Sequence, residues 1–448
     1  MAKKACHSEL VSETNKGGES LPLARTSSLA TPSSGGHPRN APVDTLIEAP
    51  YVLPEGWEWC KQNEVCRLTD GEKKTDVSYP YLEVKYLRGN KEKDFVTSGK
   101  FIKAGTKVIL VDGENSGEVF TVPEDGYMGS TFKALSIQNV DEKYLQFFIQ
   151  TKKDLYRNNK KGSAIPHLNK DLFFNMPFPL PPTLTEQQRI VNRIETMFAK
   201  LDQAQEKAQA VLDSFETRKA AILHKAFTGE LTANWRKENG VSDDSWEEKR
   251  LEDECDFITK GTTPKKEDMS IGTGDIPYIK VYNLCFDTNL DFSIDPTFVK
   301  LESHKNFLAR SITLPGDVLM NIVGPPFGKV SIVPDTYPEW NINQAIARFR
   351  CKPELYNVYL ANYLISPKTI ENMSRQIKTT AGQQNLTLEI CRNITIPVPR
   401  FPEQQEIVRI LDTVLEKESR AKEAAQTVLD QIALLKKSIL ARAFRGEL

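Results

Sequence analysis

The four residues Gly324–Phe327 (GPPF) come closest in type and spacing to catalytic chemistry. Enzymes that methylate amino groups in DNA carry Asn or Asp, two prolines, then Tyr or Phe. In them the first side chain accepts a hydrogen bond from the target amino group, and the ring stacks on a flipped base. Glycine offers no side-chain acceptor, and no F-x-G-x-G cofactor loop occurs in the sequence. The stretch therefore predicts a β-turn between two strands, with a counterpart in DGENSG at residues 112–117.

The same stretch, read as GPPFGK, imitates a phosphate-binding loop. That loop needs four residues between its glycines and Ser or Thr after the lysine, whereas three residues separate these glycines and Val330 follows Lys329. The histidines show no metal-ligand spacing: His7, His37, His167, His224 and His304. The seven cysteines contain no C-x-x-C, which favours reduced thiols over a zinc site or disulfides. The sequence thus predicts no catalytic residue, no metal site and no cofactor on this chain.

Two polar stretches offer a different chemistry, namely contacts to DNA. Residues 152–170 carry six basic residues interleaved with Tyr and Asn, and residues 374–385 offer basic residues and amides. Lys and Arg suit phosphates, while Gln and Asn can read adenine with two hydrogen bonds. The predicted DNA-binding residues are Arg157, Lys160, Lys161, Gly162, Lys170, Arg375, Lys378, Gln383, Gln384 and Asn385. A solvated helix end followed by a polar loop is the alternative at both places.

These two stretches occupy equivalent places in an internal repeat. Residues 186–231 align with residues 403–448 at an offset of 217 without a gap, and 22 of the 46 pairs are identical. Chance would give about 3 at typical residue frequencies. Fainter similarity upstream, as between residues 79–90 and 276–284, extends the repeat into globular regions. The chain is therefore predicted to contain a duplicated unit, a module of roughly 130–155 residues followed by the repeated segment.

Each repeated segment is predicted to form one long helix. Thr185 to Gln188 fit a capping box in the first copy, and Pro402 suits the first helical position in the second. Gly229 and Gly446 suit the position just after a helix end. Between these limits the apolar residues alternate at spacings of four and three, which is typical of a coiled-coil strand roughly 55 Å long. Two copies with the same seam most simply pair with each other.

Short apolar runs split by turns and followed by helical stretches predict an α+β fold for both modules.

The N-terminal residues are rich in Ser, Gly and Pro and have no apolar signal region, which predicts a disordered arm. The predicted domains are the arm at 1–45, a module at 46–182, a helix at 183–231, a polar linker at 232–245, a module at 246–400 and a helix at 401–448. The reduced thiols and the lack of long apolar runs predict a cytoplasmic chain outside the membrane. The net charge is −1. Any contacts to nucleic acid must then come from local patches.

This layout resembles the specificity subunits of type I restriction–modification systems. The resemblance rests on the order of the elements along the chain: a module, a helix that ends in AF-x-GEL, a link that contains W-R, a second module and a second helix that ends in AF-x-GEL. It covers residues 53–448. Its most specific element is P-L-P-P-x-x-x-E-Q-x-x-I, at residues 179–190 and, one residue shorter, at 397–407. The resemblance implies a non-catalytic subunit with two target recognition domains, each reading one half of a split, asymmetric DNA sequence. It also implies an antiparallel coiled coil with pseudo-two-fold symmetry that fixes the spacing of the two halves.

The resemblance implies partners as well, namely double-stranded DNA, two methyltransferase subunits and restriction subunits. S-adenosylmethionine, ATP and Mg would be bound by those partners, which would carry the adenine methyltransferase and ATP-dependent endonuclease activities. The repeated positions expected to dock the partner subunits are Glu186, Gln187, Gln188, Phe227, Glu403, Gln404, Gln405 and Phe444. Two alternatives stay open: a stand-alone DNA methyltransferase or nuclease, and a structural coiled-coil adaptor without DNA contact.

The two seams are apolar except for Arg218 and Glu418, and these charges predict the register. Complete antiparallel overlap sets the two charges opposite each other and small residues opposite large ones, in the pairs Ala204–Ile432, Ala208–Val428, Val211–Ala425 and Phe215–Ala421. A shift by one heptad leaves at least one of the charges without its partner, which is costly in a seam. Full overlap, with Arg218 facing Glu418, is therefore the predicted register.

Overall fold

The computed structural model describes residues 50–162, 166–324, 326–377, 379–380 and 383–448, so the predicted arm at 1–45 and Lys378 lie outside the described residues. These residues form two compact units. The first-module unit comprises residues 50–210 and 425–448, and the second-module unit comprises residues 211–424. Each unit therefore contains one module and portions of both repeated segments, so the units do not follow the linear order of the predicted domains.

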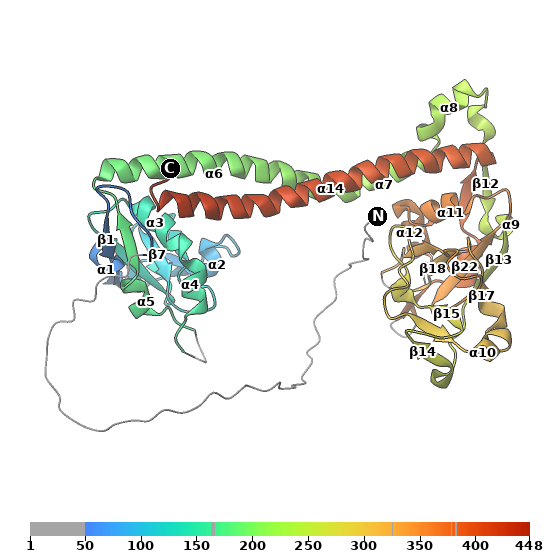
Figure 1. Cartoon of the computed structure of the whole chain (residues 1–448), viewed down its shortest axis with the longest axis horizontal. Helices are drawn as coiled ribbons and strands as arrows, with labels where there is room; N and C mark the ends of the chain where they lie inside the picture. Colours follow the sequence, from blue (N-terminus) through green and yellow to red (C-terminus); the bar gives the residue numbers. More distant parts are fainter. Residues whose placement is uncertain (1–49, 163–165, 325, 378, 381–382) are drawn as a thin grey trace. The chain divides into compact units, whose positions relative to one another are not determined.

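The first module contains a four-stranded antiparallel sheet, in the order β2-β10-β7-β8, and a mixed five-stranded sheet, in the order β3-β6-β9-β4-β5. A third pair, β1–β11, places Trp59 opposite Pro179 and so joins the start of the module to its last strand. The strands are β1 (Glu58–Lys61), β2 (Cys66–Thr69), β3 (Glu72–Lys74), β4 (Tyr79–Leu82), β5 (Phe95–Val96), β6 (Gly99–Ile102), β7 (Lys107–Leu110), β8 (Val119–Thr121), β9 (Gly126–Met128), β10 (Phe132–Ile137) and β11 (Pro177–Leu180). The helices are α1 (Gln62–Val65), α2 (Val84–Leu87), α3 (Glu142–Thr151), α4 (Lys153–Asn158) and α5 (Lys170–Phe174) (Figure 1).

The second module repeats this plan, with the four-stranded antiparallel sheet β13-β22-β18-β20, the five-stranded sheet β14-β16-β15-β21-β17 and the pair β12–β25. It adds a three-stranded sheet, β19-β24-β23. The strands are β12 (Glu247–Arg250), β13 (Cys255–Lys260), β14 (Met269–Ile271), β15 (Ile276–Ile279), β16 (Thr297–Val299), β17 (Ile312–Thr313), β18 (Val318–Asn321), β19 (Val323–Gly324), β20 (Val330–Ile332), β21 (Trp340–Ile342), β22 (Ile346–Cys351), β23 (Thr379–Thr380), β24 (Gln383–Asn385) and β25 (Thr395–Val398). The helices are α9 (Leu251–Glu254), α10 (Leu301–Lys305), α11 (Asn357–Leu364), α12 (Pro367–Arg375) and α13 (Leu388–Arg392).

The faint upstream similarity of the two copies corresponds to a shared structural feature. β4 lies within residues 79–90 and pairs in parallel with β9, while β15 lies within residues 276–284 and pairs in parallel with β21. Because the copies agree in these pairings and in the order of the four-stranded sheet, the duplication extends beyond the helices. The predicted mixture of helices and sheets in both modules is confirmed.

The repeated segments form α6 (Leu184–Asp213), α7 (Phe215–Phe227) and α14 (Phe401–Ala443). The first copy is thus two helices, not the single helix predicted, and the break falls at Ser214. The Ser214 hydroxyl bonds back to the carbonyl oxygen of Val211 at 3.3 Å, a local bond that competes with regular helix geometry. Gly229 and Gly446 both have positive φ, as expected of residues that follow helix ends.

The structure corrects two further local predictions. Thr183 caps α6, because its hydroxyl accepts from the backbone N–H of Glu186 at 3.2 Å, whereas Thr185 lies inside the helix. The predicted linker at 232–245 contains the helix α8 (Ala233–Glu238) between two 3₁₀ turns. The polar, turn-rich composition of the segment did not predict this helix. The helix is stabilised by contacts with residues far along the chain, which the local composition does not indicate.

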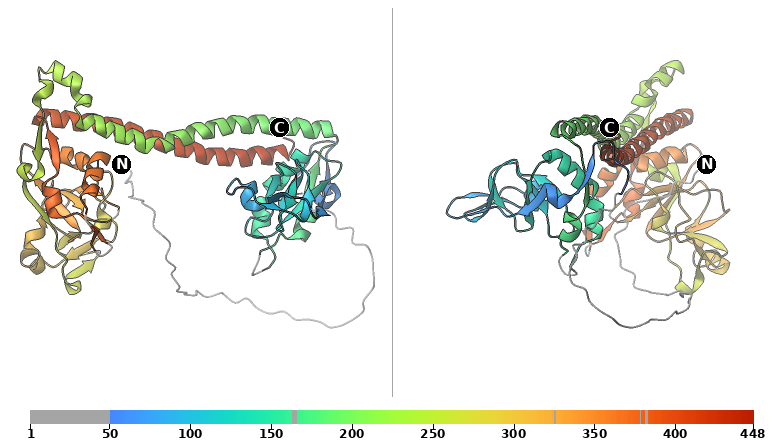
Figure 2. Two further views of the ribbon diagram at one scale, coloured as in Figure 1. Left: turned by 180° about the vertical axis from the view of Figure 1, so that it is seen from behind. Right: turned by 60° about the vertical axis from the view of Figure 1, so that its left-hand side comes forward.

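Each unit has a core in which long helices pack on a module. In the first-module unit, Ile190 and Ile194 of α6 and Phe444 beyond α14 share one apolar cluster with Tyr144 and Phe148 of α3. In the second-module unit, Leu223 of α7 and Ile407 and Leu411 of α14 share a cluster with Tyr359 and Leu360 of α11. Within the first-module unit, Figure 2 shows the C-terminal end of the chain beside α6. Each fully buried side chain of this size contributes about 1.5–3 kcal/mol, so these clusters attach the helices firmly to their modules.

Candidate nucleic-acid interface and docking positions

In the second module, the polar stretch after α12 folds back against the GPPF turn. β24 pairs antiparallel with β19, which places Val323 opposite Asn385 and Gly324 opposite Gln384. β23 pairs with the other edge of β24, with Thr380 opposite Gln383. Asn385 is exposed. The structure therefore joins two sequence features, the GPPF turn and the amide-rich stretch, in one small sheet.

Asn321 at the end of β18 stabilises the GPPF turn, and its side chain is buried. Its Nδ2 donates to the carbonyl oxygen of Pro326 at 2.9 Å, and its Oδ1 accepts from the backbone N–H of Lys329 at 3.0 Å. A buried amide with both ends bonded fixes the backbone around it. The stretch is thus a braced turn that supports β24.

The first module brings the equivalent two segments together. His167 forms isolated antiparallel bridges with Asp112 and with Lys161, and the backbone N–H of Gly113 donates to the carbonyl oxygen of Pro166 at 2.7 Å. Gly162 has a φ of 94°, a left-handed conformation that glycine adopts without strain. Residues 112–113 therefore lie against Pro166 and His167, as the GPPF turn lies against β24.

The predicted phosphate-binding lysines of the first module already have acidic partners. Lys160 Nζ lies 2.8 Å from Glu114 Oε2, and Lys161 Nζ pairs with Asp171. The hydrogen bond from Lys160 lowers the pKa of Glu114, and the hydrogen bond from Lys161 lowers the pKa of Asp171. Both carboxylates are well exposed, so these pairs are weak and can open.

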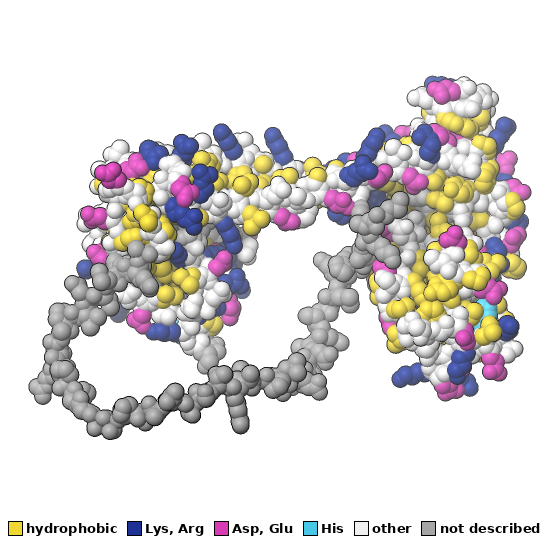
Figure 3. All heavy atoms as spheres, in the orientation of Figure 1, with side chains coloured by type: hydrophobic (Ala, Val, Ile, Leu, Met, Phe, Trp, Pro, Cys, Tyr) yellow, Lys and Arg dark blue, Asp and Glu magenta, His cyan; other side chains and the backbone are white. Residues whose placement is uncertain are grey.

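The remaining predicted contacts lie at the edges of these segments. Arg157 near the end of α4 and Lys170 at the start of α5 are exposed. Arg375 ends α12 and pairs with Glu371 at 2.5 Å. On the face drawn in Figure 3, Lys and Arg side chains are interspersed with Asp and Glu over both units. The candidate interface therefore consists of local loops in each module.

Sequence reasoning missed two residues beside the GPPF turn. Lys329 follows the turn, and its Nζ lies 5.6 Å from the centre of the half-exposed Phe286 ring. Burial lowers the pKa of Lys329. A cation next to an exposed ring suits contacts to phosphate and base. The two residues lie 43 positions apart in the sequence, so no local pattern indicated the pair.

The structure corrects the docking prediction for four of its eight residues. Gln187, Glu403, Gln404 and Phe444 are buried within their own units, so they offer no surface to a partner. Glu403 Oε1 accepts from Thr232 Oγ1 at 2.7 Å and from Arg236 Nη1 at 2.9 Å. This contact fastens the linker segment and α8 to the start of α14 and explains the buried arginine of the W-R link. Among the predicted docking residues, Gln188 and Gln405 are exposed, and Glu186 and Phe227 are partly exposed.

The repeated phenylalanines have equivalent internal surroundings. The Phe444 ring centre lies 5.0 Å from that of Tyr144 and 5.4 Å from that of Phe148. The Phe227 ring centre lies 5.3 Å from that of Tyr359 and 5.0 Å from that of Tyr363. The duplicated AF-x-GEL motif thus anchors a helix end to a module in both units.

Residues of α6 and α7 contact α14 within each unit. In the second-module unit, Arg218 Nε donates to Glu418 Oε2 at 2.7 Å. In the first-module unit, Lys436 Nζ lies 2.5 Å from Asp202 Oδ1. Two residues of α14, Val428 of the predicted seam and Leu435 one heptad further along, are 38% and 49% exposed. A seam between only two helices covers each side chain from one side, so larger residues stay partly open to water.

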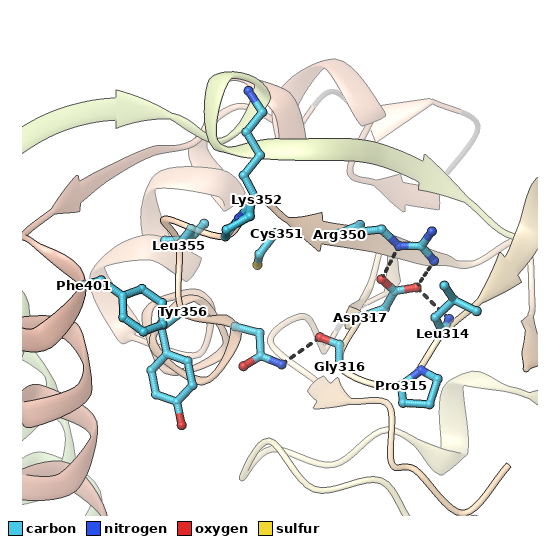
Figure 4. Close-up of a pocket in the computed structure, with 12 residues that line it drawn as sticks. Leu314, Pro315, Gly316, Asp317, Arg350, Cys351, Lys352, Leu355, Tyr356 and Phe401 are labelled. Carbon is cyan, nitrogen blue, oxygen red and sulfur yellow. Dashed lines mark hydrogen bonds and ion pairs between the residues drawn. The ribbon is translucent and has the colours of Figure 1, made fainter. Parts of the chain in front are cut away.

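A cavity of about 360 Å³ lies beside the start of α14 in the second-module unit. Arg350 Nε and Nη2 donate to Asp317 at 2.8 and 2.7 Å on one side, and these bonds raise the pKa of Arg350 (Figure 4). On the other side, the rings of Tyr356 and Phe401 lie 5.8 Å apart between centres. The cavity therefore borders the junction between the second module and α14.

Comparison with known proteins agrees with these observations. The model of the type I restriction modification DNA specificity domain matches residues 54–212 and 243–428. The MjaVIII specificity subunit of Methanocaldococcus jannaschii is 25% identical over 427 residues, covering 88% of this chain and 94% of the relative. The EcoKI specificity subunit of Escherichia coli is 24% identical over 439 residues, covering 88% and 90%.

Two solved structures share the fold. A chain from work on complex assembly and conformational transition of the type I R-M system has a TM-score of 0.68 at 19% identity, covering 89% of this chain and all of that one. The HsdS subunit from Thermoanaerobacter tengcongensis has a TM-score of 0.60 at 20% identity, covering 90% and 100%. Since the family model matches most of the sequence in two copies, this chain belongs to the type I restriction modification DNA specificity family.

Residues 50–162, 166–324, 326–377, 379–380 and 383–448 contain no group of three His, Cys, Asp or Glu placed to hold a metal ion. In this same part of the chain no helix has the length and apolar character to cross a membrane.

Proposed function

We propose that this chain is the DNA-recognition subunit of a type I restriction–modification complex and that each module reads one half of a split, asymmetric target. One observation carries the proposal: in both modules a turn of the four-stranded sheet lies against a polar segment from later in the chain, yet the residues there differ. Direct reading of bases depends on which donors and acceptors face the groove. Two modules with one backbone plan and different side chains suit two different half-sites.

The repeated helices would then act as the spacer between the readers. We place them in an antiparallel coiled coil with pseudo-two-fold symmetry, supported by the contacts of Arg218 with Glu418 and of Lys436 with Asp202. Readers held on a stiff rod reach one face of a duplex at separations near a helical turn of about 34 Å or its multiples. The length of the coil would therefore select the length of the spacer between the half-sites.

The exposed repeated residues would dock the enzymatic partners. Gln188 and Gln405 are exposed at equivalent positions of the two copies, which suits two copies of a methyltransferase subunit, while the partly exposed Glu186 and Phe227 add surface in the first copy alone. S-adenosylmethionine, ATP and Mg would act on those subunits and on restriction subunits in the cytoplasm. The domain scheme predicted above, with modules at 46–182 and 246–400, is part of this proposal.

Exchange of modules tests the proposal. Residues 54–178 would be replaced by the corresponding module of another family member, and the methylated sequence of the assembled complex would be mapped. One half of the methylated motif should change while the other half stays the same. Exchange of the second module, in the matched experiment, should change the other half only. A change in both halves after either exchange, or in neither, would contradict the proposal.

A further inference from the structure

The duplicated Glu-Gln-Gln motif contains a buried glutamine that performs one task in both units. Gln187 Oε1 accepts from the backbone N–H of Asp141 at 2.7 Å, and Gln404 Oε1 accepts from the backbone N–H of Tyr356 at 2.7 Å. Asp141 and Tyr356 are the N-cap residues of α3 and α11, the helices that follow equivalent sheets. Both glutamine side chains are buried.

The other end of each amide completes a three-way connection. Gln187 Nε2 donates to the carbonyl oxygen of Pro181 at 3.5 Å, and Gln404 Nε2 donates to that of Pro399 at 2.9 Å. Gln404 Nε2 also donates to the carbonyl oxygen of Glu354 at 2.9 Å. Each glutamine therefore connects its long helix to the start of a module helix. It also connects the helix to the short segment between the last strand of the module and the long helix itself.

These bonds differ in kind from the other contacts between helix and module. The apolar clusters that hold α6 and α14 against α3 and α11 supply attraction without direction. Hydrogen bonds to fixed backbone groups require a narrow range of distance and angle. The amide thus restricts the angle between each module and its long helix, while the apolar contacts supply most of the attachment energy.

We propose that Gln187 and Gln404 are positioning residues that set the angle of each recognition module on its helix and thereby the spacer length that the protein accepts. This inference rests on the proposed function. If the angle between a module and its helix can vary, even by a small amount, the module can contact the duplex at a wider range of positions. Loss of the amide bonds should therefore relax the choice of spacer and leave the bases read by each module unchanged.

The test uses the full chain assembled with its methyltransferase subunits and Gln404→Met, which keeps the side-chain length and removes both hydrogen-bonding ends. Methylation rates would be measured on duplexes with the native spacer and with spacers longer and shorter by one base pair. The methylation rate on the native spacer divided by the rate on an altered spacer should fall by about fivefold to tenfold. This factor corresponds to the free energy of one or two such hydrogen bonds. Gln431→Met changes an exposed glutamine of the same helix, α14, and should keep the wild-type ratio.

Gln187→Met repeats the test in the first-module unit, and thermal unfolding of every variant checks the fold. Folded variants that keep the wild-type ratio, even with lower rates on all duplexes, would overturn the inference. Unfolding of both variants would do so as well, because the glutamines would then hold the fold and not an angle. Failure of the proposed function gives a distinct result, since the wild-type complex itself would then methylate no defined split motif.

Discussion

Single ion pairs decide how readily the candidate DNA contacts can act. Lys160 keeps only 15% of its side chain exposed because it lies against Glu114, while Glu114 itself is largely in solvent. Opening an exposed pair of this kind costs little, since such pairs contribute at most about 1 kcal/mol. Phosphate oxygens can therefore replace the carboxylates as partners of Lys160 and Lys161.

Substitution of Lys160 and Lys161 by Ala tests this exchange. The double variant should bind all DNA sequences more weakly, and the slope of log affinity against log salt should fall by about 1–2, because each phosphate contact releases about one counterion. Lys143→Ala removes an exposed lysine that pairs with Glu195 and should leave the slope unchanged. An unaltered slope in the double variant would place the phosphate contacts elsewhere.

At the scale of elements, α8 depends on one buried charge pair. The Glu403 side chain is 0% exposed, and its charged partner Arg236 is 7% exposed. Arg236→Met should therefore destabilise the second-module unit by about 3–5 kcal/mol in denaturant unfolding, because a buried carboxylate would lose its counter-charge. The double variant Arg236→Met with Glu403→Met should recover much of the loss.

A matched control separates this buried pair from ordinary surface pairs. Arg420 and Glu416 form an exposed pair in the same helix, α14, so Arg420→Met should change the unfolding free energy by about 0.5 kcal/mol or less. Similar effects of Arg236→Met and Arg420→Met would mean that the linker helix is not fastened through Glu403.

Arg218 and Glu418 offer a test of how α7 and α14 pair. Arg218→Glu alone should destabilise the second-module unit by about 1–3 kcal/mol, since it sets two like charges side by side. Adding Glu418→Arg should restore much of that loss in a double-mutant cycle measured by thermal unfolding. Strict additivity of the two changes would show that the side chains do not interact in solution.

At the scale of the whole chain, the start of the first module is tied to the last residues. The Tyr51 hydroxyl donates to the carbonyl oxygen of Phe444 at 2.8 Å. Burial raises the pKa of Tyr51 to about 12, so the hydroxyl remains a donor at neutral pH. The stabilisation that the protonated Tyr51 hydroxyl contributes is fully present below the pKa of tyrosine in the unfolded chain, about 10. It is lost as pH rises through the folded pKa of about 12.

Deletion of residues 1–45 should leave stability and complex assembly unchanged, because a polar segment rich in Gly, Ser and Pro is not expected to bury a core. Tyr51→Phe should instead cost about 1 kcal/mol of unfolding free energy at neutral pH, a difference that should shrink as pH rises above about 10. Both effects can be followed by denaturant unfolding and by size-exclusion chromatography with the methyltransferase subunits. Loss of assembly in the deletion variant would assign the arm a role that its composition does not indicate.

The sequence by itself determined the features that depend on local order along the chain. The duplication, the long helices, the glycines that follow their ends and the mixed modules all follow from residue spacing and from turn and capping preferences within short segments. The placement of the two polar stretches at equivalent positions also follows from the repeat. These features need no knowledge of which segments meet, since hydrophobic period and backbone preference are set by neighbours in sequence.

Only the tertiary structure decided which residues face inward and which segments meet. The motif Glu-Gln-Gln reads as polar surface, yet Gln187, Glu403 and Gln404 are buried, because their partners are backbone and side-chain groups far along the chain. The linker helix depends on Glu403 in the same way. A polar residue is buried when distant groups satisfy its hydrogen bonds, and that satisfaction exists only once the chain has folded.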